Sequence, residues 1–323
     1  MNGRKDLNIR LAACVLMLAL AVAVPARSVY GKSPTILLVS DCSAPGTYTG
    51  TPPDDVNERD NSLVWFLEGL GYTVDTSGMN KAYQEWQTPF NDLGKLAALD
   101  TADLVLVSRH TDSLYYDNNR QNWNELKKPL LLMNGYLTRG GGDNRWGWTT
   151  GGNGNANLAE TNIVIEAGQE THPFVAGLTS PIAAFDWSSA PTPGEAPKWI
   201  FLPNSAPVAG ATVIGRFDSM PILMDIPAGT DFDANNTNGP YGIAGGPRGL
   251  LVTWGYDIYL GTPYNRDATF TDFLTEDYLA LFAQMLNELF HETIYVDADA
   301  PAGGDGRSWA TAFNYLQDAL TIA

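Results

Sequence analysis

The chain is short of cysteine and of basic residues, and each shortage excludes a class of protein. Only two of its 323 residues are cysteine, and 19 Lys and Arg oppose 36 Asp and Glu, for a formal net charge of −17. Without a stripe of positive charge, nucleic acid is not expected as a partner. If residues 1–26 are removed, Cys14 goes with them and Cys42 has no partner for an intrachain disulfide.

What the sequence does hold is enough apolar material for a large core. Hydrophobic residues make up 44% of it and aromatic residues 11%, which excludes general disorder. The 32 glycines and 20 prolines, with only 17% charged residues, indicate many loops and are typical of an extracellular protein.

Residues 1–26 have the three parts of a secretory signal. Basic residues Arg4, Lys5 and Arg10 precede an apolar run over 11–24, and the small residue Ala26 follows Pro25. The run is shorter than the roughly 20 residues that span a bilayer. We therefore expect a signal peptide cleaved near Ala26, a secreted or cell-surface protein and no transmembrane span afterwards. An uncleaved N-terminal anchor is the alternative.

Residues 34–134 alternate between patterns of strand and helix. Continuous apolar runs predict strands buried on both faces, and apolar residues at helical spacing separate them. This alternation favours a parallel sheet with helical crossovers. The predicted strands cover residues 35–40, 72–75, 103–108 and 130–134.

Residues 135–248 change character. A loop rich in Gly, Asn and Trp over 135–157 is followed by short strand-like segments between turn residues, which predicts an antiparallel β insertion. A buried strand over 249–254 and an apolar helical stripe over 278–289 then close the first domain, which covers 34–290.

The first domain resembles the class I glutamine amidotransferase-like superfamily, which has a flavodoxin-like α/β fold. The resemblance rests on the apolar strands at 36–39 and 103–108 and on the segment from Thr171 to Leu178, similar to the His-Pro…Gly-Leu segment of trehalose-utilisation-like members. It implies a flavodoxin-like parallel sheet that carries the antiparallel insertion.

Residues 293–323 resemble the N-terminal cap of a right-handed parallel β-helix of the pectin-lyase-like kind. The resemblance rests on the segments 295–298, 303–306, 308–313 and 316–320. It implies that a longer β-helix begins here and that the whole is a bacterial multidomain surface protein.

The catalytic elbow of the amidotransferases is missing. Those enzymes place a cysteine in a G-x-C-x-G turn beside backbone oxyanion donors, and no such motif occurs here. We therefore expect no glutaminase activity and assign no catalytic residue. Cys42 follows the first strand and is interpreted as a bystander, although a nucleophile pair with His110 is an open alternative. With three histidines, no structural zinc site is expected.

Polar residues end the first, third and fourth predicted strands and form a candidate ligand site. In a flavodoxin-like order a crevice opens between the carboxyl ends of the first and third strands. Pairing of Arg109 with Asp41 is the alternative reading of this group. The candidate residues are Ser40, Asp41, Ser108, Arg109, His110, Asn134 and Tyr136.

Two further candidate sites lie in the insertion. Trp146 and Trp148, with arginines nearby, could stack on sugar rings, or could close the loop over the sheet instead. Asp231, Asp233 and Asn235 place oxygens at alternate positions, as in a Ca²⁺ loop, but the bidentate Glu is absent. We expect at most weak Ca²⁺ binding there and no other cofactor; a polar turn is the alternative.

Together these observations predict a secreted, non-catalytic amidotransferase-like domain that binds or positions a ligand, such as a saccharide or cell-surface polymer. The alternative is a carbohydrate-active enzyme, a polysaccharide lyase or glycoside hydrolase. Its active site would lie in a β-helix beyond residue 323 or at the sheet crevice.

Overall fold

The structure is a computed structural model, and it describes the predicted core strands of residues 34–254 and the helix over 276–290. The described residues are 33–42, 60–79, 86, 89–111, 113, 116, 119–143, 145–157, 159–189, 200–234, 236, 238–254, 270–271, 273–290, 296–299 and 314–316.

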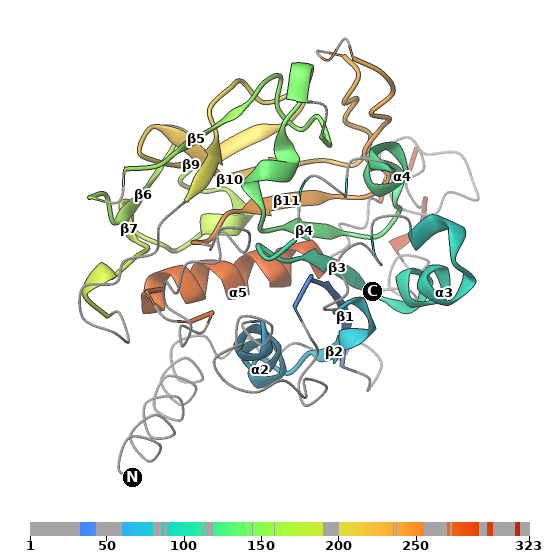
Figure 1. Ribbon diagram of the computed structural model, residues 1–323, viewed down its shortest axis with the longest axis horizontal. Helices are drawn as coiled ribbons and strands as arrows, with labels where there is room; N and C mark the ends of the chain where they lie inside the picture. The colour runs from blue at the N-terminus through green and yellow to red at the C-terminus, as the bar shows by residue number, and fades with distance from the viewer. Residues whose placement is uncertain are drawn as a thin grey trace.

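These residues form a mixed α/β fold around one nine-stranded sheet (Figure 1). Its strand order is β2-β1-β3-β4-β11-β10-β9-β6-β7. The first five strands run parallel and the other four continue the sheet antiparallel. In sequence order the strands are β1 (Thr35–Val39), β2 (Thr73–Asp75), β3 (Leu104–Val107), β4 (Leu130–Leu132), β6 (Asn162–Ile165), β7 (Ile182–Ala183), β9 (Thr212–Phe217), β10 (Met220–Ile226) and β11 (Arg248–Leu251).

The parallel half matches the strands expected from the sequence. β3, β4 and β11 are buried along their whole length, as expected where both faces of a parallel sheet are covered. β1 lies between β2 and β3, and its last residue, Val39, pairs in register with Val107. The carboxyl ends of β1 and β3 therefore lie side by side.

In the described part of the chain, four α-helices accompany the sheet: α2 (Asn61–Gly69), α3 (Leu93–Thr101), α4 (Arg120–Glu125) and α5 (Glu276–Phe290). Six short 3₁₀ turns join them to the strands: η2 (Thr76–Gly78), η3 (Pro89–Asn91), η4 (Gly135–Thr138), η5 (Gly141–Asp143), η6 (Pro173–Val175) and η7 (Trp187–Ser189).

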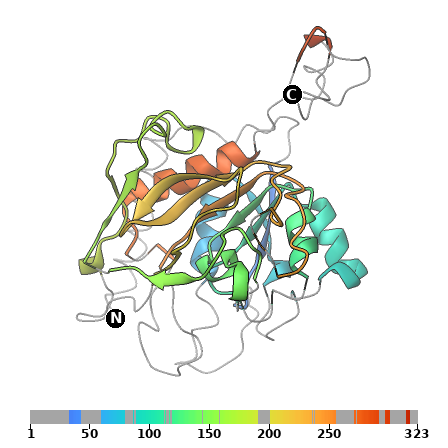
Figure 2. The ribbon, with the colours of Figure 1, turned by 90° about the horizontal axis from the view of Figure 1, so that it is seen from above.

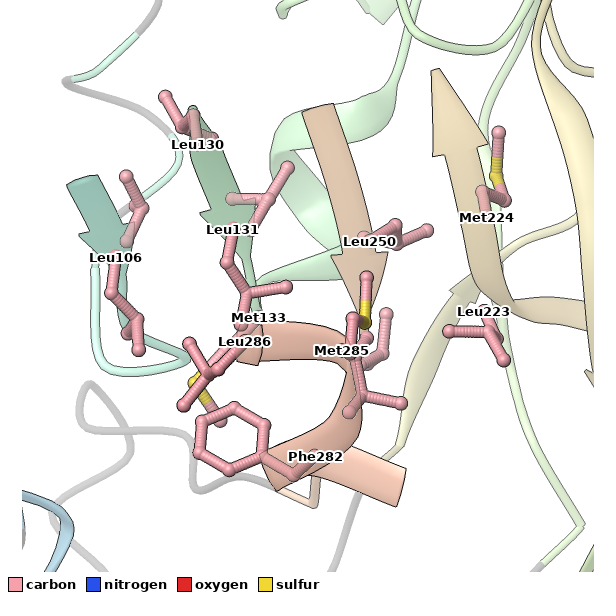
Figure 3. Packing of buried hydrophobic residues seen from close by; sticks show 14 of the residues in the cluster. Leu106, Leu130, Leu131, Met133, Leu223, Met224, Leu250, Phe282, Met285 and Leu286 are labelled. Carbon is pink, nitrogen blue, oxygen red and sulfur yellow. The ribbon is translucent and has the colours of Figure 1, made fainter. Parts of the chain in front are cut away.

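Helix α5 supplies the expected apolar stripe. It lies along one side of the sheet (Figure 2), with Phe282, Met285 and Leu286 against leucines of β3, β4 and β11 (Figure 3). Gly249 in β11 allows this close approach, because a Cβ there would lie 2.3 Å from the Met285 methyl group. Helix and strand thus close the core, as predicted.

The antiparallel half contains the antiparallel strands expected in the segment 135–248, and they continue the parallel sheet. β10, β9, β6 and β7 extend the same sheet, because β11 returns between β4 and β10 and pairs with both. Among the described strands, only β5 (Asn153–Asn155) and β8 (Phe201–Pro203) form a sheet of their own, of two strands. The described residues of the segment 135–248 therefore contribute to the same hydrophobic core as the parallel half.

Arg248 is a buried cation at the start of β11. Its guanidinium donates hydrogen bonds to the carbonyls of Lys128 and Asn124, both at 2.7 Å, and to those of Leu126 and Pro247. Burial lowers the pKa of Arg248 to about 9. The side chain satisfies carbonyls in and after the last turn of α4, which have no partner within the helix, and ties that turn to β11.

The ends of the chain are hardly described. Residues 1–26 lie outside the described residues, as does most of 293–323, so the structure tests neither the signal peptide nor the β-helix cap. Among the described residues, no helix is long and apolar enough to cross a bilayer.

Candidate functional site

Two neighbouring strands end in the same residue pattern. β1 continues as Val39-Ser40-Asp41-Cys42 and β3 as Val107-Ser108-Arg109-His110. The backbone N–H of Cys42 donates to Ser40 Oγ at 3.0 Å, and that of His110 donates to Ser108 Oγ, also at 3.0 Å. Because Val39 pairs with Val107, these turns place the thiol and the imidazole in equivalent positions at one sheet edge.

Asp60, which sequence reasoning missed, joins the two strand ends. Its Oδ1 lies 2.7 Å from His110 Nδ1, and its Oδ2 accepts hydrogen bonds from both serine hydroxyls, with the one from Ser40 at 2.5 Å. Asp60 stands at the N-cap position of α2 but makes no side-chain cap. The carboxylate points toward the strands instead of to its own helix.

Asp60 is ionised although it is only 2% exposed. Burial opposes the charge, but His110 and the hydrogen bonds from His110, Ser108 and Ser40 outweigh it and hold the pKa of Asp60 below its ordinary value. The N-terminal end of α2 adds a favourable helix dipole for an anion. An ionised Asp60 accepts from Nδ1–H, which leaves Nε2 as the nitrogen that can take up a proton.

We call Ser40, Cys42, Asp60, Ser108 and His110 the Asp60 cluster. Cys42 is 3% exposed and His110 is 9% exposed. A sulfur, a carboxylate oxygen and a ring nitrogen, one from each of Cys42, Asp60 and His110, lie within 4.8 Å of one another. His110 Nε2 is buried and has no hydrogen-bond partner in the described part of the chain.

The Asp60 cluster fits a metal ion poorly, even though thiol, imidazole and carboxylate are metal-ligand types. Both oxygens of Asp60 already accept hydrogen bonds, one of them from the His110 ring itself. Without Asp60, only the Cys42 sulfur and His110 Nε2 are left as ligands, and structural zinc takes four.

The structure brings the predicted strand-end residues together. Asn134, after β4, donates from Nδ2 to the Thr111 carbonyl at 2.7 Å and accepts the N–H of Tyr136 at 2.9 Å, which orders the turn beside the Asp60 cluster. The hydroxyl of Tyr116 donates to Asp41 at 3.2 Å. Whether the group binds a ligand stays a prediction.

Two arginines lie next to the Tyr136 ring. The guanidinium carbons of Arg109 and Arg139 are 5.5 Å and 5.3 Å from its centroid, within cation–π range. Phe201 of β8 packs on the same ring with centroids 4.1 Å apart. In so acidic a chain this concentrates positive charge at the carboxyl ends of β3 and β4.

The two tryptophans proposed for sugar binding are core residues, so that expectation is corrected. Trp146 and Trp148 are both 0% exposed. Their indole N–H groups donate to the Tyr116 carbonyl and to Asn124 Oδ1, at 2.9 Å each. No ring face is left for a sugar, because the rings pack on Trp123, Phe232 and each other.

The expected Ca²⁺ loop is ordered by its own backbone. Both carboxylate oxygens of Asp233 accept N–H groups, from Tyr241 at 2.7 Å and Gly242 at 3.1 Å, and Asp231 accepts the N–H of Asp233 at 2.9 Å. Asn235 lies outside the described residues. These bonds are those of a polar turn, while weak Ca²⁺ binding stays a prediction.

Comparison with known proteins finds only distant structural likeness. No protein-family model and no curated protein matches the chain. Cytoplasmic protein STM3548 from Salmonella typhimurium matches with a TM-score of 0.37 and 12% identity over 77% of this chain and 98% of its own. Cytoplasmic protein STM1381 from Salmonella typhimurium LT2 matches with a TM-score of 0.39 and 11% identity, over 79% and 99%.

The names of these two structures contradict one expectation. Both are described as cytoplasmic, whereas residues 1–26 led us to expect a secreted or cell-surface protein. Secretion is therefore withdrawn and forms no part of the proposals below.

Proposed function

We propose that residues 34–290 form a flavodoxin-like, amidotransferase-like domain that binds a small carboxylate or polyol at the carboxyl ends of β1, β3 and β4. The strand order β2-β1-β3-β4-β11 supports this fold, since it is the order of the flavodoxin-like type. In such sheets ligands bind where the order reverses, here between β1 and β3.

The observation that carries the proposal is His110 Nε2. An unpaired buried polar atom costs about 1–3 kcal/mol, so native proteins rarely keep one without a reason. The two serine hydroxyls, the Asp60 carboxylate and His110 Nδ1 satisfy one another, and Nε2 does not take part. A ligand hydroxyl or carboxylate bonded to Nε2 removes this penalty.

The positive charge beside Tyr136 favours a carboxylate over a neutral polyol. Arg109 is buried and Arg139 half-buried, so an anion between β3 and β4 meets two guanidinium groups in a partly desolvated setting. Charge-assisted hydrogen bonds of this kind are about twice as strong as neutral ones. The ligand is therefore expected to carry a carboxylate toward Arg109 and a second polar group toward His110.

A screen of small carboxylates and polyols tests the proposal. We expect at least one carboxylate to raise the melting temperature and to bind by calorimetry. Affinity should fall about tenfold or more in Arg109→Ala and in His110→Ala, which corresponds to about 1.4 kcal/mol. His172→Ala is the matched control, since His172 also contacts an aspartate but lies on the antiparallel half. Binding that is equal in all variants, or absent throughout the screen, contradicts the proposal.

A further inference from the structure

We propose that Cys42 and His110 form a nucleophile–base pair, oriented by Asp60, and that Cys42 accepts the acyl group of a small ester or thioester. The inference deepens the proposed function and rests on it, because it makes the ligand of the strand-end site an acyl compound. The thiol would act from the end of β1, without the nucleophile elbow of the amidotransferases.

The relative positions of the three residues carry the inference. Cys42 and His110 occupy equivalent positions after two paired strands, and one ligand atom of each lies within 4.8 Å of the others and of Asp60. Asp60 holds His110 through Nδ1 at 2.7 Å. A nucleophile, a base and a group that orients the base are the parts that covalent catalysis requires.

The hydrogen bonds around Asp60 set the direction in which the proton moves. With Nδ1 committed to the carboxylate, His110 has only Nε2 with which to accept the thiol proton. The buried negative charge of Asp60 stabilises the imidazolium that results, and an adjacent imidazolium stabilises the thiolate. Nε2 and the thiol are not yet hydrogen-bonded, and such contacts often tighten only when substrate binds.

Besides the acyl compound, the reaction requires only water. The Cys42 thiol gives its proton to His110 Nε2, and the sulfur attacks the carbonyl carbon. The C–S bond forms as the bond to the leaving alcohol or thiol breaks, and that group takes the proton from His110. Water then hydrolyses the thioester to release the acid and restore the thiol. Because Cys42 is 3% exposed, only a small acyl group can reach it.

p-Nitrophenyl acetate is the probe for this reaction. We expect the full chain to release one equivalent of p-nitrophenolate in a burst and to carry an acetyl group on Cys42, located by mass spectrometry of its peptides. His110→Gln should slow this acetylation by about 100-fold or more, the usual contribution of a positioned base. His172→Gln and Cys14→Ala should leave it unchanged. Equal rates in His110→Gln and wild type, or acetylation elsewhere than Cys42, overturn the inference.

A measurement on the unmodified protein covers the case in which His110→Gln fails to fold. An activated thiol reacts with iodoacetamide faster in the folded chain than in urea, despite its burial, whereas a bystander thiol reacts more slowly when folded. Slower alkylation in the folded chain therefore overturns the inference. Protection of Cys42 by one equivalent of Zn²⁺ also does so, and reassigns the pair as metal ligands.

The two proposals can fail separately. If a carboxylate binds and its affinity depends on Arg109 while Cys42 stays inert, the inference is wrong and the proposed function stands. If Cys42 is acetylated with the expected dependence on His110 but no carboxylate binds or competes, the proposed ligand class is wrong while the nucleophile–base pair stands.

Discussion

Asp60 and Arg248 are buried charges near opposite ends of the parallel strands, and they are held in different ways. Asp60, at the carboxyl ends of β1 and β3, is held by side chains: two hydroxyls and an imidazole. Arg248, at the amino end of β11, is held by backbone carbonyls. Carbonyls cannot titrate or change rotamer, whereas side chains can. We infer that Arg248 is a fixed structural tie and that the Asp60 cluster is the end able to respond to a ligand or to pH.

Replacing Arg248 should produce the largest loss of stability. Arg248→Met leaves the carbonyls that accept from its guanidinium buried without donors, and we expect the free energy of unfolding to fall by at least about 3 kcal/mol. Urea denaturation measures this. Arg216→Met is the matched control, because Arg216 is 38% exposed and pairs with Glu166, so it should cost less than about 1 kcal/mol. Similar losses in both variants would mean that Arg248 is not the tie we describe.

Neutralising Asp60 should produce the second-largest loss of stability. In Asp60→Asn, one carboxylate oxygen is replaced by an NH₂ group, which then faces a hydrogen-bond donor of the cluster instead of accepting from it. We expect the free energy of unfolding to fall by about 2 kcal/mol. Asp225→Asn is the control, since Asp225 also faces a histidine, 3.4 Å from His172 Nε2, but is 25% exposed. It should cost less than about 1 kcal/mol. If Asp60→Asn leaves the free energy of unfolding unchanged, the carboxylate does not hold β1, β3 and α2 together.

Acid should weaken the Asp60 end and spare the Arg248 end. The pKa of Asp60 in the folded chain lies below its ordinary value, so its contribution to stability is complete above that ordinary value. The contribution is lost as the pH falls from about 4 through the lowered pKa. Denaturation at several pH values should show this loss in wild type and in Arg248→Met. If Asp60→Asn loses as much stability in acid as wild type, the loss comes from other carboxyl groups.

Single hydroxyl deletions should have the smallest effects. Ser40→Ala and Ser108→Ala each remove one donor to Asp60 Oδ2 while the other stays, and each should cost about 1 kcal/mol. The double variant should cost more than the sum, because Oδ2 then has neither donor. Simple additivity in this double-mutant cycle, followed by urea denaturation, would show that the two serines act independently.

The strands and half of the candidate site could be predicted because both depend on local pattern. Apolar runs located β1, β3 and β4, and parallel strands necessarily bring their carboxyl ends to one edge. The repeated valine–serine ending of β1 and β3 was also available, and it places Cys42 and His110 in equivalent positions.

The rest depends on side-chain directions that no local pattern encodes. An Asp before a helix usually caps it, but Asp60 turns toward two strand ends whose serines come from positions 20 and 48 residues away. Trp146 and Trp148 lie in a Gly-rich stretch whose composition is typical of a surface loop. They are buried because Trp123 of α4 and Phe232, which lie 23 and 84 residues away in the sequence, pack on their rings, which is a consequence of long-range contacts.

The position of β11 has a consequence for synthesis on the ribosome. β11 is the last strand of the sheet to be made, yet it lies in the middle, between β4 and β10. Until residue 251 leaves the ribosome, the nascent chain has two unpaired sheet edges, one on each half, and each is a template for pairing with another chain. Newly made chains should therefore be most prone to aggregate just before β11 emerges, and a stall within residues 227–247 should be more harmful than one after 251.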